Sequence, residues 1–293
     1  MRMGVIVPQG WTGEFDGWDP KRAWSRAEAV ARRADDLGFE SIWVYDHFHT
    51  IPEPTEEITF ESFTMLAALG AITSSVRLGH VVMCAGYRNP ALVAKMISTM
   101  DVQTGGRMEL GIGAGWKRDE WEGYGYGFPS AGDRLDHLAE SLEVNTAMMG
   151  PGPSSYHGDH VSIDDAINVP QPLQRPRVPI MVGGNGPEVT WRIAARFADE
   201  LNLDGKTPDE VADDLPVIAS RCEEIQRDPE SLDVSVHVFT ERLSPSGEER
   251  VDMLGRYQSL GVSRVIGLVR ESAETDEALV SLARDARAAG VEI

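Results

Sequence analysis

The stretch VRLGHVVMCAGYRNPALVAKMISTMDVQTGGRMELGIGAGW, residues 76–116, decides the fold. It opens with an apolar run from Val76 to Met83 and closes with another from Met108 to Ile112, and both are typical of buried strands. Between them, Asn89-Pro90 predicts a helix start and Gly105-Gly106 predicts its end. The helix carries one apolar stripe, made of Leu92, Val93, Met96, Ile97 and Met100. The stretch therefore predicts a strand–helix–strand unit, which joins parallel strands.

The same alternation continues along the whole chain. Further strands are predicted at 3–8, 41–45, 178–182, 200–203, 232–239 and 264–268, and further helices at 133–149, 187–198, 208–226, 248–260 and 274–289. The first helix has Asp19 as N-cap, Pro20 at its first position and Gly38 after its end. Eight strands, each followed by a helix, predict an α/β fold of the TIM type, a closed (β/α)8 barrel. A proline-rich segment at 151–179, with a hairpin around Tyr156–Val161, is predicted as an insertion before the fifth strand.

Composition narrows the class of protein. A chain of 293 residues suits one barrel domain spanning 1–293, because such barrels take about 250 residues. Cys84 and Cys222 lack the spacing of a disulfide framework or a zinc site, which predicts a reducing, cytoplasmic location. The net charge of −20 disfavours a nucleic-acid partner, and no apolar run is long enough to predict a membrane span.

The chemistry of such barrels lies on the loops that follow the strands, so we searched those positions. The second strand ends in Asp46-His47, and a histidine at a barrel mouth can pass protons near neutral pH. His49 follows two residues later, and a His-x-His pair at a strand end is typical of barrel metallohydrolases, which are the alternative. Further histidine ligands are missing from the fifth and sixth strand ends, and His237 falls inside the seventh strand, so we expect no metal. His157 and His160 fall in the proline-rich insertion and are interpreted as solvated.

Two glycine-rich turns are the other candidates for a ligand-binding site. Gly111-Ile112-Gly113-Ala114-Gly115 fails the dinucleotide fingerprint because Trp116 stands at its last position, and it is interpreted as room for a flat ring. The stronger pattern, 183–187, follows a buried strand and precedes a predicted helix. Free amides and the helix dipole would there form an anion site suited to a cofactor phosphate. A tight turn without a ligand is the alternative.

These motifs together resemble the luciferase-like monooxygenase superfamily, and more closely its branch of oxidoreductases that depend on the deazaflavin coenzyme F420. The resemblance is carried by WVYDHF at 43–48, the block at 78–116, DEWEGYGYGFPSAGDRLDHLAESLEV at 119–144 and PIMVGGNGPEVTWRIAARFADELN at 179–202. Beyond Gly205 only the general pattern of helix and strand continues.

The resemblance implies roles for individual residues. His47 would be the catalytic proton-transferring residue beside the hydride-carrying carbon, and Asp46 would hydrogen-bond the coenzyme. The bond between Val81 and Val82 would be a cis peptide behind the ring. Further coenzyme contacts would come from Cys84, Ala114 and Gly115, and from the phosphate site at Gly183, Gly184, Asn185, Gly186, Glu188 and Val189.

The function implied is hydride transfer between the deazaflavin C5 and a small organic substrate; the alternative is an FMN-dependent monooxygenase in the same pocket. Trp116 stands where the family's sugar-phosphate dehydrogenases carry an acid/base glutamate, which disfavours glucose 6-phosphate. A wall of Trp11, Trp18, Trp116 and Trp121 instead predicts a hydrophobic or planar substrate. A barrel without chemistry, acting as a binding module, is a further alternative. Family members commonly form a homodimer, for which Phe60, Phe63, Met65 and Leu66 could supply an apolar face, although the same residues could pack on their own barrel.

Overall fold

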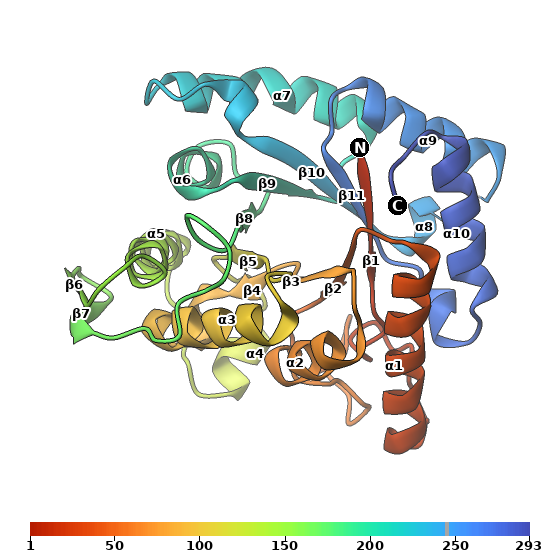
Figure 1. The fold of residues 1–293 in the computed structure, drawn as a ribbon, viewed down its shortest axis with the longest axis horizontal. Coiled ribbons are helices and arrows are strands. Elements are labelled where there is room, and N and C mark those ends of the chain that lie inside the picture. Colours follow the sequence, from red (N-terminus) through yellow and green to blue (C-terminus); the bar gives the residue numbers. More distant parts are fainter. Residues whose placement is uncertain (244–245) are drawn as a thin grey trace.

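Parallel strands form a barrel in the computed structural model, which describes residues 1–243 and 246–293 (Figure 1). The strands of the barrel are β1 (Arg2–Ile6), β2 (Ser41–Val44), β3 (Arg77–His80), β4 (Met83–Cys84), β5 (Leu110–Gly113), β8 (Ile180–Gly183), β9 (Glu200–Asp204), β10 (Asp233–Val238) and β11 (Arg264–Gly267). They occur at all of the predicted places. The side chains of most of them are buried on both faces, as the continuous apolar runs indicate.

The third predicted strand is divided into two. β3 and β4 are its halves, and they form the two ends of the sheet order β3-β2-β1-β11-β10-β9-β8-β5-β4. These ends meet, because the Leu78 amide donates to the Arg107 carbonyl at 2.9 Å and the Glu109 amide donates to the Leu78 carbonyl at 2.8 Å. The sheet is therefore closed, and the (β/α)8 fold is confirmed.

Helices cover the outside of the sheet (Figure 1). They are α1 (Pro20–Leu37), α2 (Ser62–Ile72), α3 (Pro90–Thr104), α4 (Arg118–Gly123), α5 (Ala131–Met148), α6 (Thr190–Phe197), α7 (Pro208–Glu223), α8 (Thr240–Leu243), α9 (Glu248–Ser259) and α10 (Glu277–Ala288). Asp19 and Asn89 cap α1 and α3 with their side chains, and both helices end at a left-handed glycine, as predicted.

One helix boundary matters for the site. The pattern at 187–198 predicts a helix that begins at Pro187, but α6 begins at Thr190 and residues 187–189 form a turn. The prediction was wrong by one turn because a proline after glycines is equally typical of a turn. The helix end that faces the barrel mouth is therefore Thr190.

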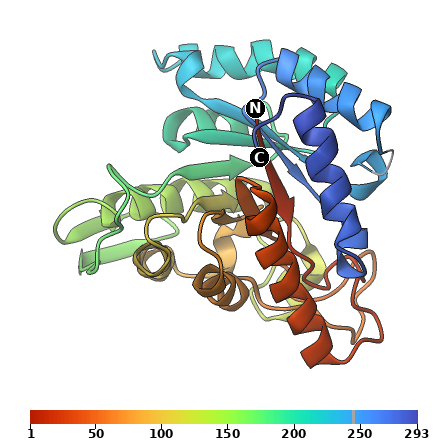
Figure 2. The ribbon, with the colours of Figure 1, turned by 45° about the vertical axis from the view of Figure 1, so that its right-hand side comes forward.

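The insertion at 151–179 is confirmed, together with its hairpin. β6 (Ser154–His157) and β7 (Ser162–Ala166) pair antiparallel and project from the barrel beside α5 (Figure 2). Val161 and Ile163 bury one face of the hairpin against Val144 and Met148 of α5. The hairpin thus covers a helix and stays remote from the strand ends.

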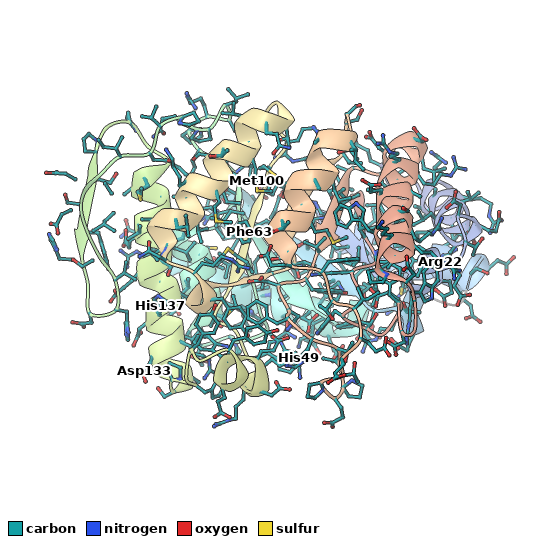
Figure 3. The ribbon with its side chains drawn as sticks, turned by 90° about the horizontal axis from the view of Figure 1, so that it is seen from below. Arg22, His49, Phe63, Met100, Asp133 and His137 are labelled. Atoms are coloured by element: carbon teal, nitrogen blue, oxygen red, sulfur yellow. The ribbon has the colours of Figure 1, made fainter. Side chains whose placement is uncertain are left out.

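The apolar residues considered for a dimer are used inside the molecule. Phe63, Met65 and Leu66 of α2 are buried, and Phe60 packs against the same core. In Figure 3, Phe63 lies between the helices together with Met100. A homodimer stays a prediction, and the buried face of α2 does not form its surface. Among the described residues, no helix combines the length and apolar character needed to cross a membrane.

Candidate active site

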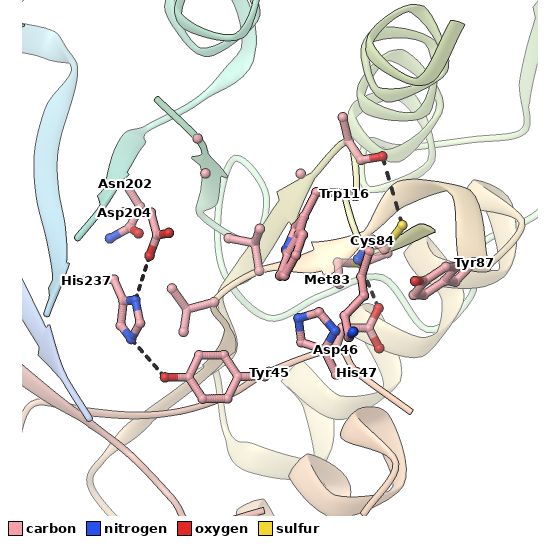
Figure 4. A pocket seen from close by; sticks show the side chains of 18 of the residues that line it. Tyr45, Asp46, His47, Met83, Cys84, Tyr87, Trp116, Asn202, Asp204 and His237 are labelled. Atoms are coloured by element: carbon pink, nitrogen blue, oxygen red, sulfur yellow. Dashed lines mark hydrogen bonds and ion pairs between the residues drawn. The ribbon is translucent and has the colours of Figure 1, made fainter. Parts of the chain in front are cut away.

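A cavity of about 310 Å³ opens where the strands end (Figure 4). Its volume lies at the lower end of the range for ligand pockets, roughly 300–1,000 Å³. Eleven of the predicted site residues line it: Trp11, Asp46, His47, Val81, Val82, Cys84, Ala114, Gly115, Trp116, Gly183 and Gly184. Five do not: Asn185, Gly186, Glu188, Val189 and Trp121.

His47 is held from two sides. Its Nδ1 lies 2.8 Å from Oε2 of Glu120, and the Trp11 ring stacks on the imidazole at 4.2 Å with an angle of 1° between the planes. Since a carboxylate accepts hydrogen bonds, Nδ1 carries the proton in the neutral ring and Nε2 is the basic nitrogen. The result is an oriented proton-transfer group on the cavity wall.

Glu120 is the most consequential residue that the sequence analysis missed. Its side chain is completely buried at the base of α4, and its carboxylate also accepts the Phe48 amide at 2.9 Å and the Tyr87 hydroxyl at 3.1 Å. Its position, seventy-three residues after His47, hid the pairing. The only available signal was a glutamate next to Trp121 in a short helix that follows a strand end.

Both carboxylate oxygens of Asp46 accept hydrogen bonds from groups of the protein. Its two oxygens accept both Arg88 nitrogens at 2.7 and 2.9 Å, the Ser62 hydroxyl at 2.7 Å and the Cys84 amide at 2.9 Å. Burial acts to raise the pKa of Asp46, but Arg88 and the Cys84 amide together lower this pKa below its usual value. Asp46 therefore ties the end of β2 to α2 and to the loop after β4, and its contact with a coenzyme stays a prediction.

The bond between Val81 and Val82 is cis, as the resemblance implies. The Val82 side chain lies across the barrel mouth, where an added Cβ at Gly113 or Gly183 would come within 2.8 or 2.7 Å of its methyl carbons. An added Cβ at Gly111 would lie 1.8 Å from the His80 carbonyl oxygen. The packing of the third strand therefore requires these glycines. Room for a flat ring beside Gly113, which lines the cavity, stays a prediction.

Cys84 forms an inert part of the wall. Burial and the nearby Asp46 carboxylate raise the pKa of its thiol to about 12, so that it stays protonated at neutral pH. Its sulfur fills the space beside Gly115, where an added Cβ would lie at 2.3 Å. The thiol therefore shapes the cavity and is not a nucleophile.

Fewer residues of the glycine-rich turn after β8 line the cavity than predicted. Gly184 has a φ of +139° and lines the cavity, whereas the Asn185 side chain bonds the backbone of Asp204 at 2.8 and 2.9 Å. Thr190, the first residue of α6, lines the cavity beside them. The positive end of the α6 dipole therefore faces the cavity through Thr190.

The tryptophans have different roles. Trp11 is 4% exposed, and its buried Nε1 has no hydrogen-bond partner among the described residues. Trp116 is 64% exposed at the rim. Trp121 is buried behind the wall against Cys84 and Tyr87, and Trp18 packs on Phe15. Trp11 and Trp116 are thus the two that can reach a bound molecule.

A second polar chain lies on the other side of the cavity. The Tyr45 hydroxyl is 2.9 Å from Nε2 of His237, and His237 Nδ1 is 2.8 Å from Oδ1 of Asp204 (Figure 4). The sequence analysis passed over His237 because it falls inside a strand. In a closed barrel, however, alternate residues near the end of a strand face the interior, and His237 is the second-last residue of β10.

The histidine pair that raised the metal alternative does not converge. His47 bonds Glu120, whereas His49 bonds the Thr50 carbonyl at 3.2 Å. No group of three or more His, Cys, Asp or Glu side chains in the described part of the chain is arranged to hold a metal ion.

Known proteins are similar to this chain in sequence and in fold. An uncharacterized protein of Mycobacterium tuberculosis is 31% identical over 204 residues, which cover 64% of this chain and 70% of that protein. A pyrimidine monooxygenase of Variovorax paradoxus is 29% identical and an F420-dependent glucose-6-phosphate dehydrogenase of Microbacterium testaceum is 30% identical. Their matches cover 68% and 60% of this chain, but only 55% and 52% of those proteins.

Solved structures agree in fold at low identity. An F420-dependent secondary alcohol dehydrogenase in complex with an F420–acetone adduct superposes with a TM-score of 0.79 at 19% identity, covering 96% of this chain and 98% of the other. The FMN complex of a type II Baeyer–Villiger monooxygenase from Pseudomonas putida superposes with a TM-score of 0.72 at 17% identity, covering 97% and 96%. The family model described as luciferase-like monooxygenase matches residues 1–258. The chain therefore belongs to the luciferase-like monooxygenase family.

Proposed function

We propose that the protein is a coenzyme F420-dependent oxidoreductase that transfers a hydride between the deazaflavin C5 and a small hydrophobic or planar organic substrate. The observation that supports this most directly is the hydrogen bond from His47, on the wall of the cavity, to the buried Glu120 behind it. A dyad of this kind is suited to proton transfer beside a redox coenzyme.

The residues present fit such a coenzyme. The cavity wall includes a buried Trp11 Nε1 donor without a partner, which a polar atom of a ligand can satisfy. Gly184 places no side chain at the cavity, and its own amide donates to the Asn202 carbonyl at 3.0 Å. Thr190 brings the N-terminus of α6 to the same place, which suits a phosphate on the coenzyme tail. The ring system would lie against the wall of Val81, Val82 and Ala114.

When bound, the coenzyme supplies hydride chemistry, and the protein contributes position and protons. His47 holds or releases a proton at Nε2, while Glu120 keeps its Nδ1–H in place. Trp11 and Trp116 shield the substrate side from water. Asp46 and Arg88 fix the loop that carries Cys84.

FMN is the second candidate, for an oxygen-dependent reaction in the same cavity. It is favoured by the 29% identity to a pyrimidine monooxygenase, and the glycine turn with Thr190 would serve its phosphate equally. The Asp46-His47-Phe48 ending and the block from Gly86 to Pro90 favour F420 by resemblance.

An equilibrium titration of the purified protein with F420 and with FMN, followed by absorbance spectra, tests the proposal. We expect F420 to bind more tightly. Binding of FMN without measurable affinity for F420 would replace the coenzyme in the proposal, and binding of neither would refute both candidates.

Two histidine variants then test the site. His47→Ala should retain coenzyme affinity and lose turnover, whereas His49→Ala should retain both, because His49 contacts the Thr50 carbonyl and Asp119 and does not line the cavity. Unchanged turnover in His47→Ala would show that His47 is not the proton-transferring residue.

A further inference from the structure

Tyr45, His237 and Asp204 form a continuous hydrogen-bonded chain that the proposed hydride transfer does not use. All three line the cavity, and they come from the ends of β2, β10 and β9. Figure 4 shows the chain on the opposite side of the cavity from Cys84 and Tyr87. The cavity therefore has two separate groups that can exchange protons, His47 with Glu120 and this chain.

Two members of the chain are buried and the third is exposed. Tyr45 is 4% exposed, the side chain of His237 is 3% exposed, and the side chain of Asp204 is 58% exposed. Burial and the carboxylates around it raise the pKa of Tyr45 well above its usual value, so the phenol stays protonated. A proton can thus enter or leave at Asp204, while the reacting end at Tyr45 is kept from solvent.

The chain has two proton arrangements with opposite hydrogen-bonding character at Tyr45. With His237 neutral, Nδ1–H donates to Asp204 and Nε2 accepts the Tyr45 hydroxyl, so the phenol oxygen can only accept from a bound molecule. With His237 protonated, Nε2–H donates to the Tyr45 oxygen, and the phenol O–H is released toward the cavity. Oδ1 of Asp204, 2.8 Å from Nδ1, is placed to accept the Nδ1–H in both arrangements.

We propose that Tyr45, with His237 and Asp204 as positioning residues, is the recognition site for a substrate oxygen that alternates between hydroxyl and carbonyl. The phenol oxygen accepts from an alcohol in the first arrangement and donates to a ketone or aldehyde in the second. This deepens the proposed function and rests on it, because the substrate oxygen must lie beside the coenzyme in the same cavity. The substrate class is therefore a hydrophobic alcohol or its carbonyl counterpart.

In the proposed reaction, protons move along the hydrogen-bonded chain, and the electrons move with the hydride. With a bound oxidised deazaflavin as hydride acceptor, the alcohol oxygen would give its proton to Tyr45 while Tyr45 passes its own to Nε2 of His237. His47 would supply the proton that the coenzyme takes up together with the hydride. The extra proton leaves through Asp204 to water. In reduction, with the reduced deazaflavin as hydride donor, each transfer runs in reverse and the carbonyl oxygen ends as a hydroxyl.

The first test needs no coenzyme and uses 4-nitrophenolate, a small planar molecule with one strong oxygen acceptor, followed by absorbance. Tyr45→Phe should bind it about tenfold or more weakly than the wild type, because one hydrogen bond to a charged acceptor is lost. Tyr257→Phe is the matched control: that tyrosine is also buried and bonds the Lys206 carbonyl at 2.5 Å, outside the cavity. Its affinity should equal that of the wild type.

The second test reports on the histidine itself. In protein with ¹⁵N-labelled histidine, assigned by comparison with His237→Asn, nitrophenolate should convert Nε2 of His237 from an acceptor to an N–H donor. Asp204→Asn should weaken both the conversion and the binding, because the amide pairs less well with an imidazolium. A purely structural role for the chain would leave the protonation of His237 unchanged by the probe.

The outcomes separate the two proposals. Equal nitrophenolate affinity in the wild type and Tyr45→Phe, no binding to the wild type, or an unchanged His237 signal would each overturn the recognition site. If the probe binds as expected but neither the wild type nor any variant binds F420, the proposed function fails and the oxygen-binding chain stands.

Discussion

Glu120 decides which nitrogen of His47 is basic. Three donors reach its buried carboxylate, namely His47 Nδ1, the Phe48 amide and the Tyr87 hydroxyl, so its charge is compensated without any basic side chain. A carboxylate so placed fixes both the tautomer and the orientation of the imidazole. The dyad therefore belongs to the folded protein and does not depend on a bound coenzyme.

Glu120→Gln should disturb this arrangement without removing volume. The amide nitrogen of the glutamine must face one of the former donors, so we expect a mixed His47 tautomer by ¹⁵N NMR and turnover lower by about tenfold or more. Coenzyme affinity should change little. Glu122→Gln, on the exposed side of the same helix, is the control and should match the wild type. A single Nδ1–H tautomer in Glu120→Gln would contradict the prediction.

His80 is a buried histidine without hydrogen bonds. Neither ring nitrogen has a partner among the described residues, and the ring packs on Phe63 at 4.2 Å. Burial lowers the pKa of His80 to about 4; the nearby Arg88 also lowers it, while the Asp46 and Glu61 carboxylates act to raise it. The ring is therefore neutral in the folded protein at neutral pH.

This shift predicts a pH-dependent stability. Since the folded pKa lies below the unfolded value of 6.5, the unfolded chain binds the proton first, and the stability present above pH 6.5 is lost as the pH falls toward 4. Over that window, urea unfolding of the wild type should lose about 3 kcal/mol more than His80→Leu does. His157→Leu, at an exposed position, should follow the wild type. Parallel curves for wild type and His80→Leu would exclude the linkage.

Among the elements, helix ends defined by local residues were predicted well, and those defined by tertiary contacts were not. Asp19 and Asn89 bond amides two and three residues ahead, so the starts of α1 and α3 can be read from the sequence. The start of α6 cannot, because Val189 caps it without a side-chain bond and Asn185 bonds Asp204 nineteen residues away. The cis bond between Val81 and Val82 came from the family resemblance, whereas the division of the third strand there was not predicted, because its apolar run is continuous.

The α6 terminus offers a direct test of the phosphate site. Thr190→Asp places a carboxylate on the first turn, which favours the helix but repels a phosphate in the cavity. We expect coenzyme affinity to fall about tenfold or more, while the free energy of unfolding stays equal or rises. Thr190→Asn, similar in size and uncharged, should keep most of the affinity. Equal affinity in the Asp and Asn variants would place the phosphate elsewhere.

At the scale of the whole molecule, the sequence predicted which ends of the strands carry the chemistry, because that follows from the fold. It did not predict which side chains meet there. His47 and Glu120, and likewise Tyr45 and His237, come together only when the barrel closes, and their separations along the chain follow no spacing rule. Side-chain pairs across a closed sheet are therefore the part of such a site that requires the structure.

The opposite end of the barrel holds a cluster of ion pairs centred on one buried guanidinium. Arg264, at the start of β11, is 1% exposed and bonds Glu109 at 2.7 and 2.9 Å; it also pairs with Glu200 at 3.3 Å and Glu40 at 3.2 Å. Burial acts to raise the pKa of Glu109, but Arg264 and Arg77 lower it to about 2. Residues before or at the start of β2, β5, β9 and β11 are thus joined at one point.

Removing that cation should destabilise the whole barrel. Arg264→Met leaves Glu109 and Glu200 buried without their main partner, so chemical denaturation should show a loss of about 3–5 kcal/mol. Coenzyme affinity of the folded variant should be unchanged, because the cavity lies at the other end of the strands. Arg256→Met removes an exposed ion pair with Asp209 and should cost at most about 1 kcal/mol. Combining Arg264→Met with Glu109→Leu should restore part of the lost stability, because one buried carboxylate without its main partner is removed. A loss no larger than that of Arg256→Met would mean that the backbone ladder alone, and not this ionic cluster, closes the barrel.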